Sequence, residues 1–260
     1  MGEEVEQLVL RIYRHRRFQH DLDGSIIDSI IAHNHRCASS DNMVNYASED
    51  DVVGMVCLMQ YEAMCKVESL ATSVLCVIAQ QRDLQPLIEI TNSGIFSKEG
   101  EFSYNKAQND LVLDLLLKET LRMFNPIELL LPRVATQELC LLDLKIRKGD
   151  AVTVSLSSLG YLESIFCRPE VFKLDRFQKC DRNTASNLDS ASTTYSGVSR
   201  ICPGIKIAEH LSKIILCNFV RFFTATKPTN QEYRLTTSRI NCVSNPSVDL
   251  LLKSTKPSSI

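Results

Sequence analysis

One cysteine in the sequence stands where a thiolate is favoured over a thiol. Cys202 lies in the stretch "YSGVSRICPGIKIAEHL" (195–211), two residues after Arg200 and directly before Pro203 and Gly204. Proline suits the first turn of a helix. The N-terminus of a helix presents backbone N–H groups and a partial positive charge, and a nearby arginine adds to both. Three roles are open for this thiol: an ordinary buried residue, a nucleophile, or a metal ligand.

The surroundings of Cys202 favour the ligand over the nucleophile. A nucleophilic cysteine needs a base within hydrogen-bond reach. His210 lies two turns further along the same expected helix, which is a poor position for that role. A ligand needs no base, and Gly197 and Gly204 allow the backbone of the loop to come close to a flat cofactor.

A second group of charged residues is placed to form a buried ion-pair network. Glu119 and Arg122 stand three residues apart in "KETLR", so they share one face of a helix. Arg176 follows about fifty residues later between Phe172 and Phe177, which favours a buried guanidinium. Taken alone, the first pair is typical of an exposed salt bridge. Together, the three residues predict a glutamate shared by two arginines, which would fix a helix against an irregular loop.

Arg133, in "LLLPRVATQE", allows two interpretations. It is either a surface arginine at the start of a strand or an arginine aimed at an anionic group of a ligand, because guanidinium binds carboxylates with two parallel hydrogen bonds. The residues around it do not decide between these two interpretations.

The elements that must position these residues are mostly helices. Residues 3–36 predict two amphipathic helices, separated near 21–24. A longer helix is expected over 48–80, with Ser48 as N-cap, buried along its length. Further helices are expected over 104–124, ended by Pro126, and over 203–223. In the last of these, Ile207, Leu211, Ile214, Ile215 and Val220 have the spacing of a core-facing stripe.

Short strands are expected between the helices. "LCLLDLKI" and "AVTVSLSSL" flank the turn "RKGD" and predict two strands. A polar link is expected around 91–103, a polar loop over 180–194 and a hairpin around Asn245-Pro246. The fold class is therefore mainly α with small β pieces.

Composition excludes several classes of protein. The 260 residues carry a net charge of −2, which gives no reason to expect nucleic acid as a partner. Ten irregularly spaced cysteines indicate no disulfide framework, and we expect a reducing, intracellular compartment. The acidic start "MGEEVEQLVL" is not a signal peptide, and charged residues interrupt the apolar stretch 52–79. No membrane anchor is expected in this chain.

In this order, the motifs resemble the carboxyl-terminal half of a cytochrome P450. Glu119 and Arg122 match the Glu-x-x-Arg of that family's K helix, and Arg176 in "LDRF" matches the arginine of its meander. Cys202 matches the thiolate that binds haem iron (heme, iron protoporphyrin IX), with Arg200 and Gly204 at the family's offsets. "CPGIKIAE" and "SLSSLGYLESIF" are most similar to the mitochondrial branch.

The resemblance implies a fold and a set of roles. It implies a partial P450 fold, with a long distal helix, K helix, meander, Cys loop and L helix over 46–260, after an N-terminal helical segment over 1–45. It implies that Arg133 and Arg200 reach the haem propionates. It also implies a monooxygenase that takes electrons from a P450 reductase or a ferredoxin and acts on a lipophilic small molecule.

The sequence departs from the family in three places. Cys65 and Lys66, in "EAMCKV", stand where the distal helix of the family has an acid and an alcohol that deliver protons to bound oxygen. Val198 replaces the glycine four residues before the cysteine. The family is also nearly twice as long. No catalytic residue is assigned, and two alternatives stay open: a P450-like peroxide isomerase or dehydratase that needs no oxygen activation, and an inactive truncated product with at most an interaction role.

Overall fold

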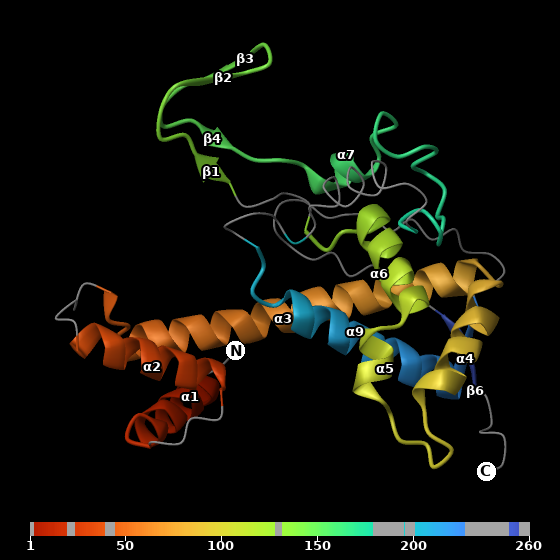
Figure 1. The fold of residues 1–260 in the computed structure, drawn as a ribbon, viewed down its shortest axis with the longest axis horizontal. Helices are drawn as coiled ribbons and strands as arrows, with labels where there is room; N and C mark the ends of the chain where they lie inside the picture. Colours follow the sequence, from red (N-terminus) through yellow and green to blue (C-terminus); the bar gives the residue numbers. More distant parts are fainter. Residues whose placement is uncertain are drawn as a thin grey trace. The chain divides into compact units, whose positions relative to one another are not determined.

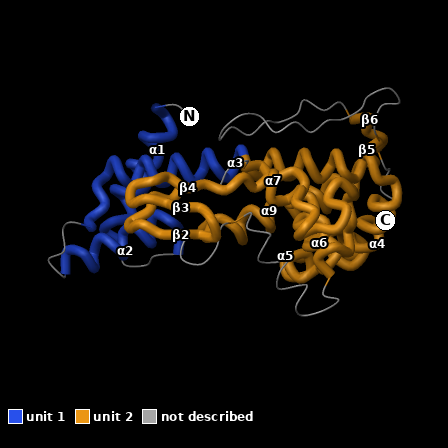
Figure 2. Tube along the Cα trace, turned by 90° about the horizontal axis from the view of Figure 1, so that it is seen from above, with its two compact units in different colours: residues 1–65 blue, residues 66–260 orange. Residues whose placement is uncertain are grey.

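The computed structural model describes residues 3–19, 24–39, 45–127, 132–178, 195, 201–226 and 250–254 (Figure 1). The chain forms two compact units, residues 1–65 and 66–260, which Figure 2 colours separately. Helix α3 (Glu49–Gln80) contributes its first half to unit 1 and its second half to unit 2. From the family resemblance we expected an N-terminal helical segment over 1–45 and a P450-like part over 46–260. That division stays a prediction.

Unit 1 contains the two expected N-terminal helices, α1 (Glu3–Arg16) and α2 (Ile26–Ser39), and the start of α3. Their apolar sides meet in a small core that includes Tyr13, Ile31 and Val52. Asn34, which is buried, ties the unit together because its amide donates to the Ala47 carbonyl and accepts from the Ala47 N–H, both at 2.9 Å.

Helix α3 begins where its cap predicts but is less buried than we expected. The Ser48 hydroxyl accepts from the Asp51 N–H at 3.2 Å, and the Asp51 carboxylate accepts from the Ser48 N–H at 2.9 Å. This reciprocal pair satisfies two backbone donors of the first turn. The prediction of burial along the whole helix is wrong: Val52 and residues 67–79 contribute buried positions, whereas Leu58, Tyr61 and Met64 in the middle are exposed.

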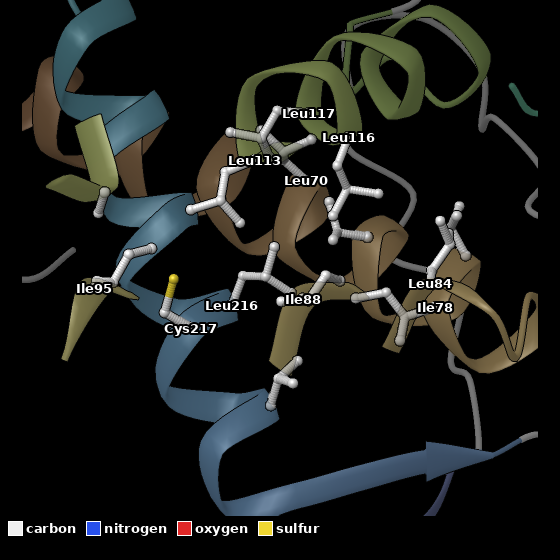
Figure 3. Close-up of a cluster of buried hydrophobic side chains, with 14 of the residues drawn as sticks. Leu70, Ile78, Leu84, Ile88, Ile95, Leu113, Leu116, Leu117, Leu216 and Cys217 are labelled. Atoms are coloured by element: carbon white, nitrogen blue, oxygen red, sulfur yellow. The ribbon is translucent and has the colours of Figure 1, made fainter. Parts of the chain in front are cut away.

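Unit 2 has its core where four helices meet. These are the second half of α3, α4 (Leu84–Ile95), α6 (Leu111–Met123) and α9 (Ile205–Phe222). Figure 3 shows their side chains converging: Leu70 and Ile78 of α3, Leu84, Ile88 and Ile95 of α4, Leu113, Leu116 and Leu117 of α6, and Leu216 and Cys217 of α9. This core positions α6, which carries Glu119, and α9, which follows Cys202.

The helix expected over 104–124 is in fact two helices. Helix α5 (Tyr104–Gln108) is followed by its C-cap Asn109, and α6 starts after Asp110, whose carboxylate accepts from the Leu113 N–H at 3.0 Å. The N-cap explains the break, since Asp110 must leave the helical conformation to cap α6. The polar link expected from residue 91 is also shorter, because α4 runs on to Ile95.

Within the described residues, three two-stranded antiparallel sheets accompany the helices. Strands β1 (Arg133–Val134) and β4 (Ala151–Val152) pair, as do β2 (Leu139–Leu141) and β3 (Leu144–Ile146), and β5 (Phe223–Thr226) and β6 (Leu251–Ser254). The two strands that we expected on either side of "RKGD" are wrong in detail. The chain turns inside the first of them, at Leu142-Asp143, and "LSSLG" is helix α7 (Leu156–Gly160).

The fold class is confirmed as mainly α with small β pieces. The polar loop expected over 180–194 and the hairpin expected around Asn245-Pro246 lie outside the described residues. Within the described part, no helix is both long enough and apolar enough to cross a bilayer.

Candidate functional site

The buried charge network forms at the C-terminal end of α6. Leu113, Leu116 and Leu117 of this helix face the core of unit 2. Glu119 and Arg122, three residues apart, lie together on an enclosed side of the helix. Arg122 donates to both oxygens of the Glu119 carboxylate, from Nε to Oε2 at 2.8 Å and from Nη2 to Oε1 at 2.9 Å. The predicted pair is therefore a bidentate ion pair, and it is buried.

Arg176 joins this pair from the irregular segment that follows α7. Its Nε donates to Oε1 and Oε2 of Glu119 at 2.9 and 3.1 Å, which confirms the predicted cluster. The rest of its guanidinium binds backbone carbonyls: Nη1 binds Cys167 O at 2.9 Å, and Nη2 binds Arg168 O at 3.2 Å and Val171 O at 2.8 Å. One side chain thus fixes the path of the segment from Cys167 to Arg176 against α6.

Two backbone groups complete the network, and sequence reasoning missed both. The Lys173 N–H donates to Glu119 Oε1 at 3.0 Å, and Arg122 Nη1 donates to Gly160 O at 2.7 Å. The second contact locks the end of α7 to α6. Every partner of Glu119 is an N–H donor that approaches a carboxylate, so each hydrogen bond is charge-assisted.

The network explains why a glycine stands at position 160. A Cβ built on Gly160 would lie 2.3 Å from the backbone carbonyl oxygen of Arg122. The side chain of Arg122 is also enclosed by rings, since its guanidinium carbon lies 5.3 Å from the centroid of Phe166 and 5.9 Å from that of Tyr161. The close approach of Gly160 to the Arg122 carbonyl brings the end of α7 directly against α6.

Cys202 precedes α9, as predicted, and its side chain is exposed. Its N–H donates to Tyr195 O at 2.9 Å, and its own carbonyl accepts from the Ile205 N–H at 3.4 Å. A Cβ on Gly204 would lie 3.8 Å from Cys202 Sγ, in ordinary van der Waals contact with the sulfur. The sulfur is thus presented to solvent at the entrance of an 18-residue helix.

Tyr195, which sequence reasoning did not single out, anchors the loop of Cys202. Its ring packs against the core of unit 2, and its buried hydroxyl has no hydrogen-bond partner within the described part of the chain. Burial, followed by the negative charges of Glu209 and Cys202, raises the pKa of the Tyr195 hydroxyl well above its ordinary value. The phenol therefore stays neutral and acts here as a packing group.

The other predicted site residues are not brought into the network. Arg133 begins β1, is exposed, and donates from Nη1 to Pro132 O at 3.4 Å. Arg200 lies outside the described residues. The roles of Arg133, Arg200 and Gly204 toward a ligand stay predictions.

A second charged cluster holds α9 in place. The buried Lys213 ammonium donates to Gln108 O at 2.8 Å and pairs with Asp114, so it ties α9 to α5 and α6. Glu209, one turn earlier, is half-buried. Its pKa is raised above the ordinary value by burial first and by the charge of Asp114 second, against opposing effects of Lys213, Lys118 and His210.

Replacing Glu209 by glutamine is expected to stabilise the protein at pH 7. A carboxyl group whose pKa is higher in the folded state binds its proton more tightly there, so its contribution to stability falls as the pH rises from about 4.3 through the folded pKa. Glu209→Gln removes this loss. Because the group is half-exposed, we expect a gain of under about 1 kcal/mol in the free energy of unfolding.

Urea unfolding at pH 7 and pH 4 tests this prediction. The gain should be present at pH 7 and absent at pH 4, and the exposed control Glu163→Gln should show neither effect. A Glu209→Gln variant that is less stable than the wild type at pH 7 would mean that Glu209 forms a favourable ion pair instead.

Comparison with known proteins finds one family whose model matches most of the chain. The family model described as Cytochrome P450 matches residues 72–252. Cytochrome P450 736A117 of Prunus mume is 31% identical over 125 residues, which are 46% of this chain and 24% of that protein. Tabersonine 16-hydroxylase 1 of Catharanthus roseus is 31% identical over 114 residues, 44% of this chain and 22% of the relative.

An animal relative and a solved structure extend the comparison. Steroid 17-alpha-hydroxylase/17,20 lyase of Oryzias latipes is 29% identical over 119 residues, 46% of this chain and 23% of that protein. The crystal structure of the cytochrome P450DA heme domain shares the fold with a TM-score of 0.78 at 17% identity, over 97% of this chain and 53% of that one. The matched region is thus about a quarter of these curated relatives, and the chain spans about half of the solved domain.

Proposed function

Because the chain belongs to the cytochrome P450 family, we propose that it holds haem through the Cys202 thiolate and forms the carboxyl-terminal half of a haem-thiolate oxidoreductase of the monooxygenase type. Haem is the cofactor of this family. The observation that carries the proposal is the buried Glu119–Arg122–Arg176 network in a chain that also exposes Cys202 at the entrance of α9.

The residues on the ligand side fit a haem. The sulfur of Cys202 is accessible, it stands before the first turn of α9, and the neighbouring Gly204 has no side chain to block a flat ring. Nine other cysteines occur in the sequence, and two of them, Cys76 and Cys217, are buried thiols whose pKa burial raises to about 11 and about 12. Those two sulfurs are poor ligands because a metal binds the thiolate form.

Each residue has a separate part in the proposed site. Cys202 would bind the iron, Gly204 would let the loop lie against the ring, and Arg133 and Arg200 would pair with the propionates. Glu119, Arg122 and Arg176 would hold the segment from Cys167 to Arg176 in place without touching the cofactor. When bound, haem would supply the oxygen-activating chemistry that inserts one oxygen atom into a lipophilic substrate.

The relatives support this reaction class, and the distal helix supports an alternative. Tabersonine 16-hydroxylase 1 and steroid 17-alpha-hydroxylase/17,20 lyase are named hydroxylases, which favours oxygen insertion. The electrons would come from a reductase or a ferredoxin. Cys65 and Lys66 of α3, however, replace the acid and the alcohol expected for proton delivery, and neither of them supplies the same proton donors. A peroxide isomerase or dehydratase, which needs no oxygen activation, is therefore the second candidate.

A third candidate is an inactive truncated product with at most an interaction role, which would not hold haem. The chain spans about half of the solved haem domain. The assignment to the carboxyl-terminal half and the similarity to the mitochondrial branch stay predictions.

Haem binding is tested by the absorption spectrum of the purified chain after addition of haem, reduction and exposure to carbon monoxide. We expect the band of a thiolate-ligated haem in the wild type and its loss in Cys202→Ser. Cys140→Ser, at another exposed cysteine, is the control and should keep the band. The same band in Cys202→Ser would exclude Cys202 as the ligand, and no band in any variant would favour the truncated product.

A further inference from the structure

Helix α2 carries a histidine and a cysteine whose side chains meet one turn apart. His33 and Cys37 are the first and last residues of "HNHRC" (33–37). The spacing i, i+4 places two side chains on one face of a helix, where a pair of ligands can reach the same metal ion. Cys37 is buried and His33 is exposed, so the pair extends from the interior of unit 1 to its surface.

The distance between the two side chains is close to that of two ligands on one small metal ion. Cys37 Sγ and His33 Nε2 are 3.4 Å apart. A tetrahedral ion with a histidine nitrogen at about 2.1 Å and a cysteine sulfur at about 2.3 Å holds these two atoms about 3.6 Å apart. The pair therefore has to open by only about 0.2 Å to bind such an ion.

A backbone oxygen lies beside the same nitrogen. Asn45 O is 2.9 Å from His33 Nε2, and a carbonyl oxygen can only accept a hydrogen bond, so Nε2 carries a proton in this arrangement. Nitrogen and oxygen ligands at right angles around one ion are about 3.0 Å apart. A metal ion that takes the place of this proton would therefore have Asn45 O within reach as a third ligand.

We propose that His33 and Cys37 bind a divalent metal ion of the zinc class, with Asn45 O as a third ligand and water completing the coordination. Thiolate and imidazole select zinc and similar transition metals, whereas Mg²⁺ and Ca²⁺ prefer oxygen ligands. On binding, Cys37 releases its thiol proton to solvent. The proton of the neutral His33 ring moves from Nε2 to Nδ1, so one proton is released for each ion bound.

The number of ligands limits the affinity of this site. Among the described residues, no three His, Cys, Asp or Glu side chains are grouped closely enough to hold an ion. A structural zinc site has four protein ligands, so we expect weaker binding here, with a dissociation constant between about 1 μM and 1 mM.

A bound ion would also brace unit 1. It would join α2 to the segment that leads into α3, which Asn34 already holds through two hydrogen bonds to Ala47. Because a ligand that binds only the folded state stabilises it, Zn²⁺ should raise the Tm of the chain. The inference does not depend on haem, so it stands or falls separately from the proposed function.

Titration of the full chain with Co²⁺ tests the proposal. All proteins carry Cys202→Ser, so that the proposed haem ligand cannot contribute. We expect a saturable sulfur-to-cobalt charge-transfer band in the near ultraviolet, which Zn²⁺ removes by displacing Co²⁺ and Mg²⁺ does not. Cys37→Ser should abolish the band, and His33→Ala should raise the dissociation constant at least tenfold. His35→Ala is the matched control, because His35 is exposed on α2 two residues from both ligands, and it should bind like the parent.

Circular dichroism must show the helix content of the parent in each variant. Because Cys37 is buried, Cys37→Ala replaces Cys37→Ser if the serine variant loses helix, and His33→Ala tests the pair from its exposed side. The absence of a saturable band up to about 1 mM Co²⁺ would overturn the proposal. A band that survives at Cys37→Ser, or an affinity unchanged by His33→Ala, would overturn it as well, because the ion would then bind at other residues.

Discussion

Replacing Glu119 by glutamine is expected to lower the free energy of unfolding of unit 2 by about 3–5 kcal/mol. The carboxylate is fully buried and accepts hydrogen bonds from Arg122, from Arg176 and from the Lys173 N–H. Glutamine keeps the shape of the side chain but removes the negative charge. The guanidinium groups of Arg122 and Arg176 then repel each other in a site of low dielectric constant. The NH2 group of the new amide also faces N–H donors, with which it cannot form hydrogen bonds.

The loss should appear in a specific place as well as in global stability. The Lys173 N–H is protected from exchange by its hydrogen bond to Glu119 Oε1, at 3.0 Å. Hydrogen exchange should therefore accelerate at Lys173 in the variant, together with the segment that Arg176 holds. Urea unfolding gives the global value, and Glu163→Gln, at an exposed glutamate, is the control with a change of under about 0.5 kcal/mol.

A second variant separates charge from geometry. Arg176→Lys keeps the positive charge but loses the planar fork that reaches Glu119 and three carbonyl oxygens at once. We expect it to be less stable than the wild type and more stable than Glu119→Gln. If Glu119→Gln unfolds at the urea concentration of the wild type, the network contributes little to stability, and its proposed role in fixing the loop is wrong.

The sequence contained enough to predict this network because its signals are local. Helical periodicity alone places Glu119 and Arg122 on one side of α6, and the flanking Phe172 and Phe177 indicated that Arg176 is buried. The backbone partners, Gly160 O and Lys173 N–H, carried no such signal. Backbone groups are the same in every residue, so their positions depend on the path of the irregular segment, which the side-chain types do not specify.

Two elements were mispredicted for different physical reasons. The strands around "RKGD" were misplaced because the real turn, Leu142-Asp143, lacks glycine, proline and asparagine, and Leu142 adopts a positive φ of 53° that leucine rarely takes. The buried face of α9 was only partly predicted, since Val220 is buried as expected but Ile207, Leu211 and Ile215 are exposed, because both faces of the helix are apolar. A period of 3.6 residues identifies such a helix but cannot say which stripe meets the core.

Replacing Gly160 by alanine is expected to have the second largest effect, although it adds one methyl group. The new Cβ would lie 2.3 Å from Arg122 O, far inside van der Waals contact. The obstacle is backbone in the last turns of α6, so no side chain can rotate out of the way. Helix α7 must then move away from α6, and this movement lengthens the 2.7 Å hydrogen bond from Arg122 Nη1 to Gly160 O. We expect a loss of about 1–3 kcal/mol in the free energy of unfolding.

The same substitution at another glycine of unit 2 should have the opposite sign. Gly94 lies near the end of α4, and a Cβ built there meets nothing within 4 Å. Gly94→Ala should therefore stabilise the chain by up to about 1 kcal/mol, because alanine favours the helical conformation. Urea unfolding of both variants gives the comparison. If Gly160→Ala is as stable as Gly94→Ala, α7 can separate from α6 without cost, and the Arg122–Gly160 contact does not hold the two helices together.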